Sequence, residues 1–217
     1  MANLSRLEPT LRADHTALIL FDCLHGFLYP PDLARRKRIK DANIVSNLTR
    51  LLRAARRAGM TTFYPCVSYA PDGSDVVQRL TDTDNDLRPV GERTAKAMGA
   101  HMKRGSKNSE IVAPLKPKKG DVIIPKHKWN AFLYTDLEFH LRCRNLDTII
   151  LAGGSTDVGI AATAYGARDL DLGLVVVKDA CHALYPESSA FFLNRVFPRM
   201  GRVRTVDEVT TLMKVKL

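Results

Sequence analysis

Leu151–Ala167 reads LAGGSTDVGIAATAYGA, and this stretch decides the fold class. Its apolar start is typical of a buried strand, Gly153 and Gly154 allow a tight turn, and the small residues beyond them suit a closely packed helix. The helix is expected to begin near Thr156, where unpaired backbone N–H groups and the helix dipole favour negative charge. The stretch therefore predicts one strand–turn–helix unit of an α/β fold.

Apolar runs alternate with segments of helical period along the rest of the chain, and each run predicts a strand. The strands are expected at Thr16–Phe21, Thr61–Val67, Asp121–Ile124, Thr148–Ala152, Leu174–Val177 and Arg202–Thr205. Most of them lack polar alternation, as expected of parallel strands that are covered on both faces. The pattern predicts a three-layer α/β/α, Rossmann-like fold with a six-stranded parallel sheet, in a single domain over residues 1–217.

Four segments between the strands predict helices. The first carries its apolar side chains on one face between Ile44 and Ala55, and Gly59 is expected to end it. The others are expected at Thr135–Arg144, Thr156–Leu170 and Pro186–Met200, the last broken near Pro198. Thr135 and Glu138 have the spacing of a capping box.

The composition limits the classes of protein to which the chain can belong. With 217 residues, 45% of them hydrophobic, the chain is long enough for a full core. It has no run of about 18 apolar residues and no secretion signal, so neither a membrane span nor export is expected. The four cysteines lack a Cys-x-x-Cys spacing and are expected to be reduced and mostly buried. These features predict a cytoplasmic protein.

The net charge of +10 invites a nucleic-acid interpretation. Basic residues cluster at positions 35–38 and again at Lys116, Lys118 and Lys119. Both clusters are expected in loops, with few aromatic residues among them and no nucleic-acid motif, so no nucleic-acid partner is expected. They are interpreted as solvated surface, which could also draw small anionic substrates toward a cleft.

Two charged side chains stand where predicted strands end. Asp22 follows the first strand in LILFDCLHGF, and Lys126 ends the third in VIIPKHKWNAF. Ligands of parallel α/β sheets bind at the carboxyl ends of the strands, so both residues are candidates for one site. Partial burial would raise the pKa of Asp22, which suits a general acid or base. The alternatives are an Asp22 that only caps the next loop, a solvated Lys126, or Lys128 as the relevant lysine.

These segments and the glycine turn together resemble the isochorismatase-like cysteine hydrolases. LILFDCLHGF is similar to the family's Asp-bearing first strand, although Leu24, His25 and Gly26 replace its usual Gln-Asn-Asp. VIIPKHKWNAFLYTDLEFHLRCRNLDTIILAG is similar to the Lys-bearing strand, the next turn and helix, and the fourth strand. Its Asn-Ala-Phe aligns with the family's Ser-Ala-Phe, which selects Lys126 over Lys128. With the later VVVKDACHA, the resemblance spans nearly the whole chain.

At the glycine turn the family pattern is G-V-x-T-x-x-C-V-x-x-T-A, and here Gly159 stands in place of the nucleophilic Cys. Of the implied Asp-Lys-Cys triad, Asp22 and Lys126 are present. The true isochorismatases also carry Gly at this position, and they cleave a vinyl ether, which needs proton transfer rather than a protein nucleophile. The resemblance therefore implies a hydrolase of a small anionic or aromatic metabolite, with Asp22 as general acid and Lys126 as its electrostatic partner.

Other chemistries at the same place stay open. The pair could activate water against an amide, lactam or ester, or the pocket could bind a metabolite or a protein partner without catalysis. Cys66 or Cys181 could replace the missing thiol, whereas Cys23 should point to the other face of its strand. The presence of both Asp22 and Lys126 favours an enzyme, because a pocket that only binds needs no proton-transfer pair.

The resemblance assigns a second role to the glycine turn. Family members have a non-proline cis peptide there, which corresponds to Gly154–Ser155, and the N–H groups of Ser155 and Gly159 would form an oxyanion hole. Gly159 would also open space beside the substrate. Tight packing between strand and helix is the simpler reason for these glycines.

Four further side chains are candidate substrate contacts. Phe27 and Trp129 are expected to line the pocket, with core packing as the alternative. His25 and His182 could reach the strand-end cleft, with a structural role as the alternative. The zinc site of the related nicotinamidases is not expected, because no histidine occurs between His25 and His101, and no metal or other cofactor is predicted.

The connection at residues 68–117 is long and polar, and it is either a functional lid or a surface excursion. Its part at 68–105 resembles the family least, and the specificity for substrate would be set there and at positions 24–26. Family members are commonly dimers or larger, so a homodimer or larger homo-oligomer is expected.

Overall fold

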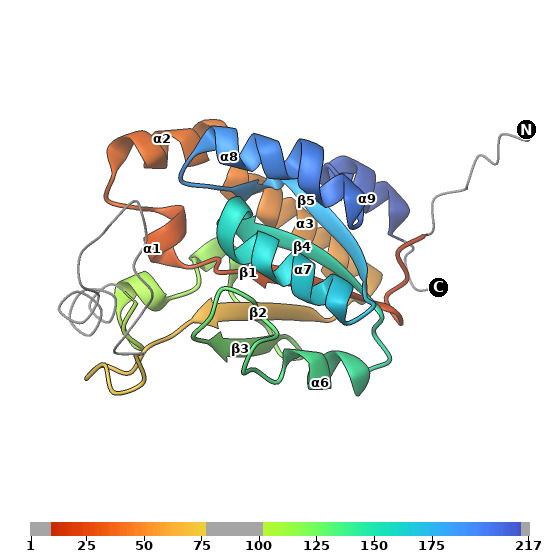
Figure 1. The fold of residues 1–217 in the computed structure, drawn as a ribbon, viewed down its shortest axis with the longest axis horizontal. Coiled ribbons are helices and arrows are strands. Elements are labelled where there is room, and N and C mark those ends of the chain that lie inside the picture. The colour runs from red at the N-terminus through yellow and green to blue at the C-terminus, as the bar shows by residue number, and fades with distance from the viewer. Residues whose placement is uncertain (1–9, 77–101, 214–217) are drawn as a thin grey trace, which may run out of the picture.

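The chain folds around a six-stranded parallel sheet with helices on both faces (Figure 1). The computed structural model describes residues 10–76 and 102–213. The strands are β1 (Thr16–Phe21), β2 (Thr62–Val67), β3 (Val122–Lys126), β4 (Thr148–Gly154), β5 (Gly173–His182) and β6 (Arg202–Arg204). Their order is β3-β2-β1-β4-β5-β6, and all neighbouring pairs are parallel. The predicted α/β/α fold class is confirmed.

Helices cover the sheet, and short helical turns connect the elements. The α-helices are α1 (His25–Leu28), α2 (Leu33–Asp41), α3 (Ile44–Ala58), α6 (Leu137–Arg142), α7 (Ala161–Asp169), α8 (Pro186–Phe191) and α9 (Val206–Leu212). The short turns are η2 (Lys107–Ser109), η3 (Ala113–Leu115), η4 (Thr156–Ile160), η5 (Phe192–Val196) and η6 (Phe197–Arg199). Among the described helices, none has the length and apolar character that crossing a bilayer requires.

The side chains of β1 alternate between two apolar layers. Leu18 and Leu20 pack into the layer formed with α3 and α9. Ile19 and Phe21 pack into the layer formed with α6 and α7. Because consecutive side chains of a strand point to opposite faces, a strand covered on both sides must be apolar throughout, and all six residues of β1 are buried.

Three predictions about helices were wrong: the location of the basic cluster, the start of α6 and the position of the capping box. The basic cluster at positions 35–38 lies on α2 rather than in a loop, because Asp32 caps this helix by accepting a hydrogen bond from the Arg35 N–H at 2.6 Å. Helix α6 begins at Leu137 rather than at Thr135, whose hydroxyl instead donates to the Ala131 carbonyl. The capping box occurs instead at the start of α9, between Thr205 and Glu208.

Strand β5 continues to His182, well beyond the predicted end at Val177. A register shift separates the two halves of its pairing with β4, and the second half pairs Gly153 with Cys181 and Gly154 with His182. The polar residues Lys178 and Asp179 interrupt the apolar run, so hydrophobicity alone could not locate the second half.

The strand order reverses direction between β1 and β4. In open α/β sheets, ligands bind at the carboxyl ends of the strands beside this switch point. Asp22 directly follows β1, and the glycine turn follows β4, so the two most informative motifs of the sequence lie on either side of it.

Candidate functional site

Asp22 and Lys126 form a buried ion pair at the carboxyl edge of the sheet. The Lys126 ammonium donates to Oδ2 of Asp22 at 2.8 Å, and the N–H of Val67 donates to Oδ1 at 2.8 Å. Val67 lies at the end of β2, the strand between β1 and β3, so three adjacent strands build the pair. Asp22 is 6% exposed and Lys126 is 3% exposed. Lys126 is therefore not a solvated lysine, and Asp22 does more than cap a loop.

Asp22 sits in an unusual backbone conformation that turns the chain at the end of β1. Its φ of 47° lies in the left-handed region, which few residues other than glycine adopt and which is enriched at functional sites. Burial raises the pKa of the Asp22 carboxyl, against the opposing effects of Lys126 and of the Val67 N–H. A carboxyl whose pKa is raised retains a proton to a higher pH than usual, which suits a proton donor.

The phenyl ring of Phe21 fills the space beside Gly159. A Cβ atom at position 159 would lie 2.5 Å from Cζ of this ring, far inside van der Waals contact. The ring is buried, and the Lys126 Nζ lies 4.3 Å from its centroid in a cation–π arrangement. The expectation that Gly159 opens space beside a substrate was therefore wrong, because Phe21 occupies that space.

The glycine turn leads from β4 into η4 and α7. The peptide bond between Gly154 and Ser155 is cis, as the family resemblance implied. The Ser155 hydroxyl donates to Asp157 at 2.6 Å, and the Ser155 carbonyl accepts from Ile160 at the first turn of the helix. The oxyanion role of the Ser155 and Gly159 N–H groups stays a prediction.

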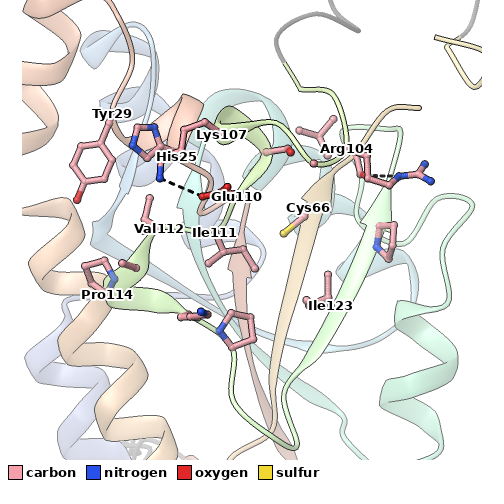
Figure 2. A pocket seen from close by; sticks show the side chains of 18 residues that line it. His25, Tyr29, Cys66, Arg104, Lys107, Glu110, Ile111, Val112, Pro114 and Ile123 are labelled. Atoms are coloured by element: carbon pink, nitrogen blue, oxygen red, sulfur yellow. Dashed lines mark hydrogen bonds and ion pairs between the residues drawn. The ribbon is translucent and has the colours of Figure 1, made fainter. Parts of the chain in front are cut away.

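A cavity of about 770 Å³ lies between the ends of β2 and β3 and the segment at 104–117 (Figure 2). Its lining residues on β3, Ile123 and Pro125, alternate with Lys126 along the strand and therefore lie on the opposite face of the sheet from the Lys126 side chain. Among the described residues its lining contains neither Asp22 nor Lys126, but it contains Val67, which binds Asp22, and Cys66. Its charged lining residues are mainly basic: Arg104, Lys107 and Lys116, with Glu110 as the acidic one. The cavity therefore adjoins the strand ends that carry the ion pair but is separate from the pair itself.

The second half of the 68–117 connection packs against the chain just after Asp22. Ile111 forms a bridge with Leu24, and the Val112 N–H donates to the Cys23 carbonyl at 3.2 Å. This places the described part of the connection at the edge of the site. The choice between lid and surface excursion depends also on residues 77–101, which lie outside the described residues.

The four predicted substrate contacts do not share one cavity. His25 lines the cavity of Figure 2. Phe27 is half-buried and packs against the apolar layer of α3. Trp129 is 68% exposed, and His182 is buried at the end of β5, on the far side of β4 from Asp22. Their contact with substrate stays a prediction.

With this geometry established, comparison with known proteins identifies the family. A model of the isochorismatase domain matches residues 16–208. The chain belongs to the isochorismatase family. The isochorismatase family protein YecD of Escherichia coli O157:H7 is 31% identical over 199 residues, which cover 92% of this chain and 96% of YecD.

Two further relatives carry the names of hydrolases. The ureidoacrylate amidohydrolase RutB of Variovorax paradoxus is 27% identical over 216 residues, covering 94% of this chain and 84% of RutB. The crystal structure of a cysteine hydrolase from Pseudomonas syringae pv. phaseolicola 1448A is similar with a TM-score of 0.78 at 26% identity, covering 94% of each chain. Family and relatives together make this protein a hydrolase.

The cysteines of this family member do not offer a substitute thiolate near Asp22. Burial raises the pKa of Cys23 and of Cys66, and it raises the pKa of Cys181 to about 12. Cys143 is exposed on the far end of α6. Since the thiolate is the nucleophile, the raised pKa disfavours attack by the buried cysteines.

The described residues contain no group of three His, Cys, Asp or Glu side chains arranged to hold a metal ion.

The sequence did not point to the roles of two side chains, Phe21 and Arg35. Phe21 was assigned only to a strand, although it is the one aromatic residue of TALILF and directly precedes Asp22. Arg35 was assigned to solvated surface, although its place three residues after a capping Asp favours a helix.

We predict that Gly159→Cys alone destabilises the protein, because a Cβ atom there overlaps a buried ring; overpacking of this kind costs about 1–3 kcal/mol. Combining it with Phe21→Ala makes room for the thiol beside Lys126. Denaturant unfolding and iodoacetamide labelling with mass spectrometry measure both effects, in a Cys143→Ser background that removes the exposed thiol.

The double variant is expected to be alkylated at the thiol introduced at position 159, whereas the parent without a cysteine there keeps its activity in iodoacetamide. A Gly159→Cys protein as stable as the parent would contradict the assignment of Phe21, and so would loss of the parent's activity through alkylation of one protected cysteine.

Proposed function

We propose that this protein hydrolyses a small anionic metabolite by proton transfer from Asp22, in the manner of vinyl-ether cleavage, without a protein nucleophile. One observation carries the proposal: the acid and its lysine partner are intact, while the space for a nucleophilic side chain at position 159 is filled by Phe21. A reaction that needs only a proton donor and water fits such a site.

The reaction balances with Asp22 as the sole proton carrier. The protonated carboxyl gives its proton to the terminal carbon of the vinyl ether, and an oxocarbenium-like centre develops on the neighbouring carbon. Water adds to this centre and returns one proton to the Asp22 carboxylate. The resulting hemiketal breaks its C–O bond to give a ketone and an alcohol. Lys126 stabilises the carboxylate that forms after the first transfer.

An anionic substrate is proposed from charge. Among the described residues, the cavity of Figure 2 is lined by Arg104, Lys107 and Lys116 and by one acidic side chain, Glu110. Lys107 pairs with Glu110 at 3.2 Å and Arg104 pairs with Asp75 at 3.3 Å, so the surplus of positive charge in this lining comes from Lys116. The net charge of +10 adds a general attraction for anions that weakens with salt. A cytoplasmic location and self-association stay predictions from the sequence.

A second candidate is hydrolysis of an amide, lactam or ester by water that Asp22 activates as a base. The similarity to the ureidoacrylate amidohydrolase RutB favours it. In that reaction the N–H groups of Ser155 and Gly159 would stabilise the oxyanion. A pocket that binds without catalysis is disfavoured, because burying a charged pair has an energetic cost that binding alone does not explain.

The first test replaces the proton donor. Asp22→Asn keeps the shape and removes the titratable group, so kcat on isochorismate, the vinyl ether named by the family, should fall by roughly 10²–10⁴-fold with a much smaller change in KM. Lys126→Met should also lower kcat, and the double variant should lose less than the product of the two effects, since the residues act as a unit.

Asp169→Asn, on the exposed surface of α7, is the matched control and should leave kcat unchanged. Full activity of Asp22→Asn on a substrate that the parent turns over would contradict both enzyme proposals. Running the series with ureidoacrylate as well separates the two substrate classes.

The second test is the pH dependence of kcat/KM. A general acid must be protonated in the free enzyme, so activity should fall as the pH rises through the pKa of Asp22, which burial raises above the usual carboxyl range. Lys126→Met removes a positive charge that lowers this pKa, and should move the falling limb of the pH profile to higher pH.

Activity that instead rises with pH through the same pKa would identify Asp22 as a base and favour the amide reaction. If the falling limb of kcat/KM lies at the same pH in Lys126→Met as in the parent, Asp22 does not control the pH dependence.

A further inference from the structure

A second cavity, of about 500 Å³, lies across β4 from the ion pair. The end of β5, α2, α8 and η5 line it. Among the described residues, its lining has no member in common with that of the cavity in Figure 2. Its basic and polar lining residues are Arg35, Arg38, Lys178, His182, Ser189 and Asn194.

His182 is the unusual member of this lining. The ring is 6% exposed, and neither of its nitrogens has a hydrogen-bond partner in the described part of the chain. Burial lowers the pKa of His182 to about 4, with a smaller contribution from Arg35. Buried polar groups are nearly always hydrogen-bonded, and one without a partner costs about 1–3 kcal/mol. The ring packs against Gly154, where a Cβ atom would lie 2.5 Å from its Cε1.

Arg35, which lines the same cavity from α2, also has a buried nitrogen, Nε, without a hydrogen-bond partner among the described residues. Burial lowers the pKa of its guanidinium. The neighbouring Arg38 guanidinium donates to the Leu184 carbonyl at 3.2 Å, which holds it at the cavity. The acidic Asp179 is already engaged, because its carboxylate accepts from the Val206 N–H at 2.8 Å.

We propose that this cavity binds a small oxyanion, a phosphate or carboxylate group, held by Arg35, Arg38 and His182. An oxyanion can accept from the Arg35 Nε–H and from the one N–H of the neutral His182 ring, and a guanidinium fork binds such a group bidentately. Among the described lining residues, Arg35, Arg38 and Lys178 are basic and Asp179 is the one carboxylate, and this surplus of positive charge favours an anion over a neutral ligand. The inference does not depend on the proposed reaction, because Asp22 and Lys126 do not line this cavity.

The site also has a contact with the glycine turn. The Ser189 hydroxyl, from α8, donates to the Thr156 hydroxyl at 3.1 Å at the start of η4. An anion bound here would therefore lie one side chain away from the turn that follows β4.

The test titrates inorganic phosphate, and separately acetate, into protein labelled with ¹⁵N at histidine, with sodium chloride of equal ionic strength as the blank. His182→Gln identifies the ring signals of His182 by their loss. We expect a saturable shift of these signals with one or both anions and none with chloride. Tighter binding of phosphate assigns the site to phosphoryl groups, and tighter binding of acetate assigns it to carboxylates.

Arg35→Gln should weaken the binding by about tenfold or more, because it removes charge-assisted hydrogen bonds. Arg57→Gln, on the exposed face of α3, is the matched control and should leave the dissociation constant unchanged. If thermal unfolding shows that Arg35→Gln is poorly folded, Arg38→Gln makes the same test from an exposed position. No saturable shift with either anion would overturn the proposal, as would equal weakening by Arg35→Gln and Arg57→Gln.

Discussion

The ion pair between Asp22 and Lys126 is the constraint on which the rest of the site depends. Taking two opposite charges out of water costs several kcal/mol for each ion, and their attraction offsets this only when the geometry is good and the remaining polar atoms are satisfied. Here one carboxylate oxygen accepts from Lys126 and the other from the Val67 N–H. Removing one partner of such a pair typically destabilises a protein by about 3–5 kcal/mol, which ties the proposed catalytic centre to the stability of the sheet edge.

The pair in turn explains the arrangement of the residues next to it. The strand order brings the ends of β1, β2 and β3 to one edge, and the ring of Phe21 lies under the Lys126 ammonium. That ring leaves no room for a side chain at position 159, so Phe21 and Gly159 are explained together. This packing is a physical reason for the proposed chemistry, which relies on proton transfer and not on a nucleophilic side chain at position 159.

The sequence was sufficient for those features that depend on simple periodicity and on strand ends. Apolar runs located all six strands, and the rule that ligands bind at carboxyl ends placed Asp22 and Lys126 in one site. The sequence was insufficient for features that depend on contacts between distant segments. The second half of β5 exists because it pairs with β4 beyond a register shift, and the ring of Phe21 meets Gly159 only after α7 packs on the sheet. The orphaned nitrogens of His182 and Arg35 likewise become visible only when burial and partners are known.

The central claim is that Asp22 delivers a proton to carbon, and turnover in D₂O tests it most directly. With isochorismate as substrate, we expect a solvent isotope effect on kcat and one deuterium in the methyl group of the released keto acid, measured by NMR or mass spectrometry against a control for exchange of the product in buffer. Turnover of isochorismate without deuterium in that methyl group would contradict the claim, and so would a parent enzyme that leaves isochorismate untouched while it consumes ureidoacrylate.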